Sequence, residues 1–234
     1  MAFKFKQFSV DDSACAMKVG TDSVLLGSWA SLDGADTILD IGTGSGLLAL
    51  MAAQKSNALI TAIDIDEQAC QQASVNFNNS PWAGRLSCHN IGLENFNTEN
   101  NYFDHIITNP PFFINSLKSP EEGRNTARHT DSLPAETLLK VSAAMLAPAG
   151  KLSLIFPIQD KMNVISHAIE GDLKLSRYTE IIPKQGKEAN RVLMEFSKCQ
   201  VKEVKSSAIV IRDANGKYTQ EYISLTEPFY LFLR

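Results

Sequence analysis

The chain has 234 residues, with 22 basic and 26 acidic side chains and a formal net charge of −4. Its 44% hydrophobic and 21% charged residues are ordinary for a globular protein and exclude a disordered, collagen-like or coiled-coil chain. The charge is uneven, with 5 basic and 12 acidic residues through Leu117 and 17 basic and 14 acidic residues after it. The negative total therefore does not exclude a polyanionic partner.

Cysteine spacing and hydropathy indicate the compartment. Cys15, Cys70, Cys88 and Cys199 lie far apart, without the spacing of metal ligands, so we expect reduced thiols and no metal site. The first residues lack the apolar core of a signal peptide, and no apolar run approaches the length that spans a membrane. These features predict a cytoplasmic protein without a membrane segment.

Short apolar runs alternate with helix-forming segments over the first two thirds of the chain. Strands are predicted at 37–41, 59–63, 85–89, 103–108 and 151–156, and helices at 47–53, 67–78 and 134–146. Strands that alternate with helices imply a parallel sheet with helices on both faces. The predicted fold class is therefore α/β, with a doubly wound sheet.

The last third of the chain has a different pattern. Four segments resemble strands, at 175–182, 191–197, 208–212 and 229–233, with few long helical stretches between them. Asn215 and Gly216 form a strong turn signal between β-prone flanks, which predicts a hairpin. We expect these strands to pair antiparallel at the edge of the sheet.

A glycine-rich loop follows the first predicted strand of the sheet, where doubly wound folds bind ligands. Its glycines are Gly42, Gly44 and Gly46, and Leu47 stands where a dinucleotide fingerprint requires a third glycine. No Lys-Ser or Lys-Thr pair follows, which excludes a nucleotide-triphosphate loop. Asp40 would repel a pyrophosphate. The pattern favours a cationic ligand without phosphate, and S-adenosylmethionine has both properties.

A second carboxylate, Asp64, ends the next predicted strand. In nucleotide sites, an acidic residue at this place accepts hydrogen bonds from ribose hydroxyls. The alternative is that Asp40 and Asp64 are ordinary capping residues exposed to solvent. Both fall at predicted strand ends, which favours the ligand site.

The motif Asn109-Pro110-Pro111-Phe112 follows the fourth predicted strand. Two prolines fix the backbone and remove N–H donors, so the Asn109 side-chain oxygen and the Pro110 carbonyl are suited to accept both protons of a planar amino group. Phe112 offers a flat face for stacking a base. The motif therefore predicts transfer to an amine, in which orientation and desolvation supply most of the acceleration.

Together these motifs resemble class I S-adenosylmethionine-dependent methyltransferases that modify amino groups. The segments 3–8, 15–29 and 222–231 are similar to bacterial tRNA (adenine-N6) methyltransferases that modify the adenine 3′ of the anticodon in a valine tRNA. The resemblance implies a Rossmann-like, seven-stranded, mostly parallel sheet with antiparallel C-terminal strands. It also implies one domain over 1–234, with an N-terminal extension at 1–36, a cofactor-binding core at 37–156 and completing strands at 157–234.

The resemblance also assigns roles to residues. The target amine would be presented by Asn109, Pro110, Pro111 and Phe112, which are the candidate catalytic residues. The residue after the third strand is commonly Asp in such enzymes and contacts the cofactor adenine; here it is Asn90. The candidate cofactor-binding residues are Lys18, Thr21, Asp22, Asp40, Gly42, Gly44, Gly46, Asp64, Ile65 and Asn90.

Two basic segments are candidates for contact with RNA. The long connection at 115–133 contains Arg124, Arg128 and His129, and a downstream cluster contains Lys184, Lys187 and Arg191. Such side chains can hold phosphates, although a solvated surface with scattered lysines is the alternative. We expect tRNA as the partner and no obligatory protein partner.

Other functions remain open from the motifs alone. The same motifs occur in enzymes that methylate rRNA guanine N2 or protein glutamine, which usually carry a separate recognition domain. A module that binds the cofactor or RNA without catalysis is a further alternative, against which the intact Asn109 motif argues. A nicotinamide dehydrogenase is disfavoured by Leu47.

Overall fold

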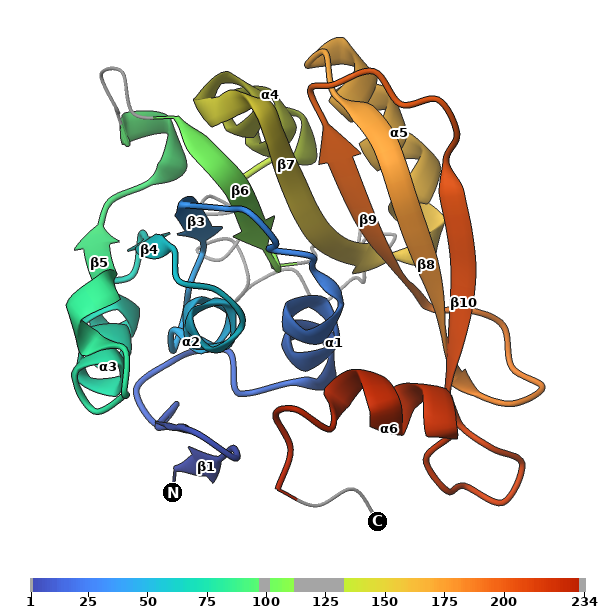
Figure 1. Cartoon of the computed structure of the whole chain (residues 1–234), viewed down its shortest axis with the longest axis horizontal. Helices are drawn as coiled ribbons and strands as arrows, with labels where there is room; N and C mark the ends of the chain where they lie inside the picture. Colours follow the sequence, from blue (N-terminus) through green and yellow to red (C-terminus); the bar gives the residue numbers. More distant parts are fainter. Residues whose placement is uncertain (1, 97–101, 112–132, 232–234) are drawn as a thin grey trace, which may run out of the picture.

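A mixed eight-stranded sheet is the centre of the computed structural model, which describes residues 2–96, 102–111 and 133–231 (Figure 1). The strand order is β10-β8-β9-β7-β6-β3-β4-β5. The strands are β3 (Thr37–Ile41), β4 (Leu59–Asp64), β5 (Leu86–Asn90), β6 (Phe103–Thr108), β7 (Leu146–Pro157), β8 (Lys174–Lys184), β9 (Arg191–Ser197) and β10 (Lys205–Arg212). A separate antiparallel pair is formed by β1 (Phe3–Lys4) and β2 (Ser9–Val10).

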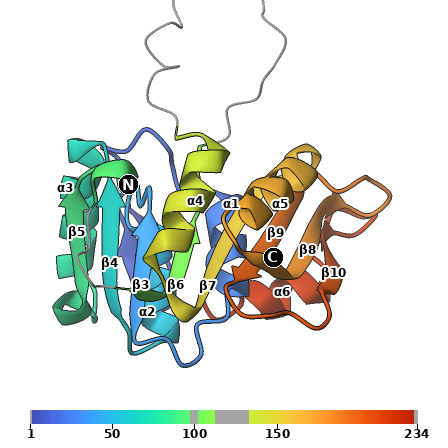
Figure 2. The same cartoon turned by 90° about the horizontal axis from the view of Figure 1, so that it is seen from above.

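Helices cover both faces of this sheet, as the α/β prediction requires (Figure 2). They are α1 (Thr21–Trp29), α2 (Leu47–Lys55), α3 (Glu67–Asn78), α4 (Ala135–Met145), α5 (Lys161–Glu170) and α6 (Gln220–Thr226). Side chains of α1, α2, α3 and α6 pack into one apolar core, and those of α4 and α5 pack into a second core on the other face. In the described part of the chain, no helix is long and apolar enough to span a membrane.

Parallel pairing brings the ends of several strands to one side of the sheet. Strands β5, β4, β3, β6 and β7 pair parallel in that spatial order, and β8 and β10 point the same way because β9 is antiparallel to both β7 and β8. We call the side where these seven strands end the carboxyl edge; it includes Asp64, Thr108, Lys184 and Arg212. The opposite side is the amino edge.

The C-terminal strands were predicted to pair antiparallel, which is correct for β9 and wrong for β10. Strand β9 lies antiparallel between β7 and β8, as expected. Strand β10, however, pairs parallel with β8 and adds an eighth strand to the seven expected. The reason is geometric: β9 ends at the amino edge, and the chain then passes β8 before it returns, so β10 lies outside β8 with the same direction.

The segment after β10 differs from the prediction. No strand forms over 229–231; Tyr230 makes only an isolated antiparallel bridge to Phe5. The helix α6 precedes it, and its cap is the Thr219 side chain, which accepts a hydrogen bond from the Tyr222 N–H. The helix α5 was also not predicted. The turn at Asn215 and Gly216 is confirmed, but its hairpin is a single bridge between Arg212 and Tyr218.

Candidate active site

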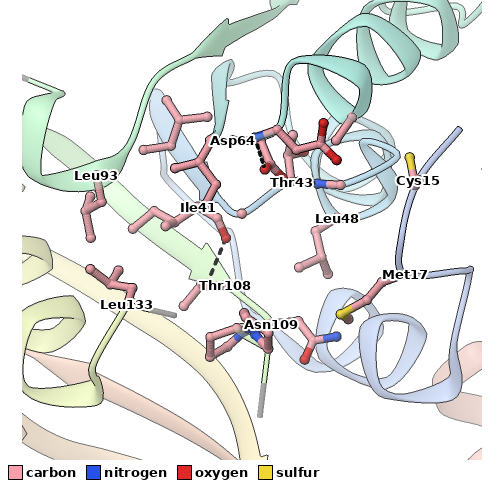
Figure 3. A pocket seen from close by; sticks show the side chains of 18 of the residues that line it. Cys15, Met17, Ile41, Thr43, Leu48, Asp64, Leu93, Thr108, Asn109 and Leu133 are labelled. Carbon is pink, nitrogen blue, oxygen red and sulfur yellow. Dashed lines mark hydrogen bonds between the residues drawn. The ribbon is translucent and has the colours of Figure 1, made fainter. Parts of the chain in front are cut away.

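A cavity of about 750 Å³ opens at the carboxyl edge, where the strand order reverses between β3 and β6. Its walls come from the glycine loop, the ends of β4 and β6, the start of α4 and the segment 15–19. Figure 3 shows Asp64 and Asn109 at opposite ends of this cavity, with Met17 on one side and Leu93 and Leu133 on the other. The motifs of the sequence thus meet at one site.

The glycine loop is held by backbone hydrogen bonds to β4. The N–H groups of Gly42 and Thr43 donate to the Ile63 carbonyl at 2.9 and 3.1 Å. The Gly44 N–H donates to Asp64 Oδ2 at 2.8 Å. Gly42 and Gly44 line the cavity, whereas Gly46 lies behind the loop as the residue that begins α2, with φ of 82°. The loop therefore brings its backbone close to a ligand at Gly42 and Gly44, and Thr43 and Ser45 also line the cavity.

Asp64 lies at the end of β4 with both carboxylate oxygens positioned. Oδ2 accepts from Gly44, and Oδ1 accepts from the Asp66 N–H at 3.0 Å. Its neighbour Ile65 also lines the cavity and is 59% exposed. Asn90 is not among the lining residues. Its amide nitrogen donates to the carbonyls of Asp64 and Ile65 at 3.1 and 3.0 Å, so it supports the turn after β4.

Asp40 is fully buried beneath the glycine loop and does not line the cavity. Its Oδ2 accepts hydrogen bonds from the Thr43 hydroxyl at 2.6 Å and from the Ala49 N–H at 3.1 Å. Burial raises the pKa of this carboxyl to about 7. Asp40 therefore joins the loop to α2.

The N-terminal segment closes one side of the cavity. Lys18 lines it, but its ammonium donates to the carbonyls of Asp12 and Ser13 at 2.6 and 3.2 Å. Thr21 and Asp22 form the first turn of α1 and are not among the lining residues. Asp22 instead makes an ion pair of 2.8 Å with Arg191 at the start of β9.

Asn109 is only 8% exposed at the end of β6. Its side-chain nitrogen donates to the Ser23 hydroxyl at 2.8 Å, while its Oδ1 is buried and has no hydrogen-bond partner among the described residues. Thr108 holds the preceding backbone by donating its hydroxyl hydrogen to the Ile41 carbonyl at 2.9 Å. Pro110 and Pro111 also line the cavity. An unsatisfied buried oxygen is costly, so this atom is suited to accept a hydrogen bond from a ligand.

Several lining residues were not singled out in the sequence. Ser23 lay inside a segment used only for the resemblance, and these apolar walls come from the loop after β5, the residues before α4 and α4 itself. An isolated leucine or isoleucine in a polar loop is the sequence signal that could have identified Ile91, Leu93 and Leu133. These apolar residues are Ile91, Leu93, Leu133 and Leu138.

The charged residues that line the cavity are Lys18, Asp64, Asp66 and Glu94. More carboxylates than ammonium groups line the cavity. The Lys18 ammonium is already hydrogen-bonded to two backbone carbonyls. A phosphate group would find no free cationic side chain among these residues. The electrostatics favour a ligand that carries positive charge. In the described part of the chain, no group of three His, Cys, Asp or Glu side chains could hold a metal ion.

The predicted RNA contacts fall into two sets. Lys184 and Lys187 are exposed in the turn between β8 and β9. Arg191 is half-buried and bonded to Asp22. The other RNA candidates, Arg124, Arg128 and His129, and the catalytic candidate Phe112 lie outside the described residues.

Two solved structures with this architecture are methyltransferases. A predicted O-methyltransferase from Agrobacterium tumefaciens has a TM-score of 0.69 at 19% identity, over 92% of this chain and 99% of that one. The N-methyltransferase NodS from Bradyrhizobium japonicum, in complex with S-adenosyl-L-homocysteine, has a TM-score of 0.55 at 18% identity over 75% and 84%. At these identities the similarity establishes the fold alone.

Sequence comparison gives the family. The model of the methyltransferase small domain matches residues 15–173. A tRNA1(Val) (adenine(37)-N6)-methyltransferase from Shewanella baltica is 46% identical over 99% of both chains. A protein of the same name from Parabacteroides distasonis is 43% identical over 98% of this chain and 97% of its own length. The chain therefore belongs to the methyltransferase small domain family, and its full length is related to these two enzymes.

Proposed function

We propose that this protein transfers a methyl group from S-adenosylmethionine to the exocyclic N6 amine of an adenine in tRNA, at position 37 of a valine tRNA. The observation that supports this most directly is that Asn109, which lines the same cavity as Asp64, has a buried Oδ1 without a partner among the described residues. The choice of adenine as the target base and of tRNA as the substrate rests on the names of the full-length relatives. A cytoplasmic location fits this substrate.

The cavity fits S-adenosylmethionine in size, charge and donor set. Its volume of about 750 Å³ is within the range of cofactor sites. Asp64 would accept hydrogen bonds from the ribose hydroxyls, and Ile65, Ile91 and Leu93 would enclose the adenine ring. The excess of carboxylates suits the positive amino and sulfonium groups. When bound, the cofactor supplies an electrophilic methyl group.

The target amine would lie at the other end of the cavity. Asn109 Oδ1 and the Pro110 carbonyl would accept its two N–H groups, which raises the electron density on the nitrogen. Both acceptors are fixed before binding, Asn109 by Ser23 and the backbone by two prolines. The site therefore acts by orientation and by preorganised dipoles.

The alternatives differ in the group that enters the cavity. Guanine N2 and the glutamine side chain also present a planar amine, so the Asn109 site alone does not distinguish them. The relatives favour adenine, since both are named for tRNA adenine and match nearly the whole chain. A binding module without catalysis would have no use for an unsatisfied acceptor opposite the cofactor site.

Transfer of labelled methyl groups to bulk tRNA tests the proposal, followed by mapping of the modified nucleotide. The wild-type protein should label one adenine of valine tRNA, and calorimetry should detect binding of S-adenosylmethionine and not of NAD. Asn109→Ala should lower kcat by about 100-fold, the usual effect of removing one preorganised contact, with unchanged cofactor affinity. Exposed Asn57 at the amino edge provides the control, Asn57→Ala, which should retain full activity. Normal turnover by Asn109→Ala would refute the mechanism.

A further inference from the structure

Two turns at the carboxyl edge are hydrogen-bonded to each other, and Figure 1 shows the strands β8 and β10 that they follow. One follows β8 and the other follows β10, and in the sheet Lys184 pairs directly with Arg212. The Gln185 N–H donates to the Arg212 carbonyl at 2.8 Å, and the Gln185 side-chain oxygen accepts from the Ala214 N–H at 3.2 Å. We call residues 184–187 and 212–217 the paired turns. Because they are bonded to each other, their side chains form one surface.

This surface is positively charged in an acidic protein. Lys184, Lys187 and Lys217 are exposed, and none makes an ion pair with a carboxylate in the described part of the chain. The carboxylate within the paired turns is Asp213, whose Oδ1 accepts from the N–H groups of Asn215 and Lys217, both at 2.9 Å. Asp213 and the adjacent Glu188 together offset two of the three lysine charges. The paired turns therefore keep free positive charge.

Arg212 adds a fixed cation to the lysines. Its guanidinium lies 4.1 Å from the centre of the Tyr218 ring, and its Nη1 donates to the Gly216 carbonyl at 2.6 Å. A cation held by a ring and a carbonyl has lost its conformational freedom before a ligand binds, so less entropy is lost on binding.

The paired turns lie at the same carboxyl edge as Asn109, but their distance from Asn109 is greater than one nucleotide can span. From β6, the sheet passes through β7 and β9 to β8 and β10, three and four strand spacings away. At about 4.8 Å per spacing this is roughly 14 to 19 Å. A group bound there belongs to the same substrate only when that substrate is large.

We infer that the paired turns bind backbone phosphates of the tRNA on one side of the nucleotide in the cavity. This inference rests on the proposed methylation of tRNA and deepens it. Exposed lysines act as point charges without base selectivity, so the surface contributes affinity and register. It does not act on the reacting amine. The expected signature is a change in KM and in salt dependence, with kcat unchanged.

A pair of variants with equal charge change tests this inference. Lys187→Gln/Lys217→Gln removes one lysine from each of the paired turns. Lys202→Gln/Lys205→Gln removes two exposed lysines at the amino edge and is the control. The first should raise KM for tRNA roughly 10-fold, and its slope of log Kd against log salt should be shallower by about 2, because two phosphate contacts are lost. The control should match the wild-type protein.

The outcomes separate the inference from the proposed function. Absence of methyl transfer to tRNA by the wild-type protein would refute the function itself. An active wild-type protein, with the same KM and salt slope in both double variants, would refute only the role of the paired turns. A fall in cofactor affinity for Lys187→Gln/Lys217→Gln would also overturn it, since the paired turns lie outside the cavity.

Discussion

Ser23 fixes the orientation of the Asn109 side-chain amide. An asparagine amide has a donor end and an acceptor end of nearly the same shape, and only the acceptor end can orient an amine. The Asn109 nitrogen donates to the Ser23 hydroxyl at 2.8 Å, which leaves Oδ1 buried and without a partner among the described residues. Ser23 acts on the proposed reaction through its hydrogen bond to Asn109, so we treat it as a positioning residue.

We expect Ser23→Ala to lower kcat by about 10-fold, because the amide would lose the bond that fixes its orientation. Cofactor affinity and thermal stability should be unchanged. Ser23→Thr keeps the hydroxyl and should restore most of the activity. Steady-state kinetics with tRNA and calorimetry with S-adenosylmethionine provide the measurements. Equal kcat values for the Ala variant and the wild-type protein would exclude this role.

At the scale of elements, the turn from β3 into α2 builds the end of the cavity that we propose holds the cofactor. Gly46 begins α2 with φ of 82°, a conformation that is unfavourable for residues with a side chain. A Cβ there would also collide with the Phe77 ring of α3. The turn therefore depends on glycine for its backbone and for the close packing of two helices.

Gly46→Ala should lower the free energy of unfolding by roughly 2 to 4 kcal/mol, from strained backbone and overpacking together. Gly84→Ala is the matched control, since a Cβ at Gly84 meets no atom within 4 Å. Urea unfolding of both variants measures the effect. A loss for Gly46→Ala no larger than that for Gly84→Ala would contradict this account of the turn.

The sequence predicted the elements best where local signals were complete. The helix predicted at 67–78 matches α3, which begins after Asp66, whose side chain accepts from the Gln68 N–H. The direction of β10 was not predictable, because it depends on which strand β10 lies beside and not on its own residues. The helix α6 was missed because its seven residues form too short a segment for periodicity to reveal.

At the scale of the whole molecule, two buried groups give stability opposite dependences on pH. Burial lowers the pKa of His105 from 6.5 to about 4, so this residue stabilises the fold above pH 6.5 and loses that contribution as pH falls toward 4. Burial raises the pKa of Asp40 from 3.8 to about 7, so its contribution is present at low pH and is lost as pH rises through 7. Each effect is about 2 kcal/mol between pH 5 and pH 7.

Single substitutions should separate these two effects. In His105→Gln only the Asp40 effect remains, so this variant should be more stable at pH 5 than at pH 7. In Asp40→Asn only the His105 effect remains, and the order should be reversed. The wild-type protein should change little, because the two effects offset each other. Urea unfolding at both pH values measures all three proteins, and the same pH trend in both variants would refute the assignment.

The whole fold also separates the basic residues that the sequence groups together. Lys184, Lys187 and Arg191 come to the carboxyl edge, whereas Lys202 and Lys205 lie at the amino edge. The excess of positive charge after Leu117 is therefore divided between two sides of the molecule. Only the part near the cavity is placed to bind the proposed substrate.

The sequence by itself determined the α/β class, the glycine loop with Asp64 and the Asn109 motif, because each is encoded in short local segments whose order along the chain can be read directly. Tertiary structure alone decided that Ser23 binds Asn109, that Asp40 lies beneath the loop, and that β10 adds a parallel strand. These contacts join residues whose meeting depends on strand order and helix packing. A local sequence pattern does not encode these contacts, because they form only when the strands and helices have assembled.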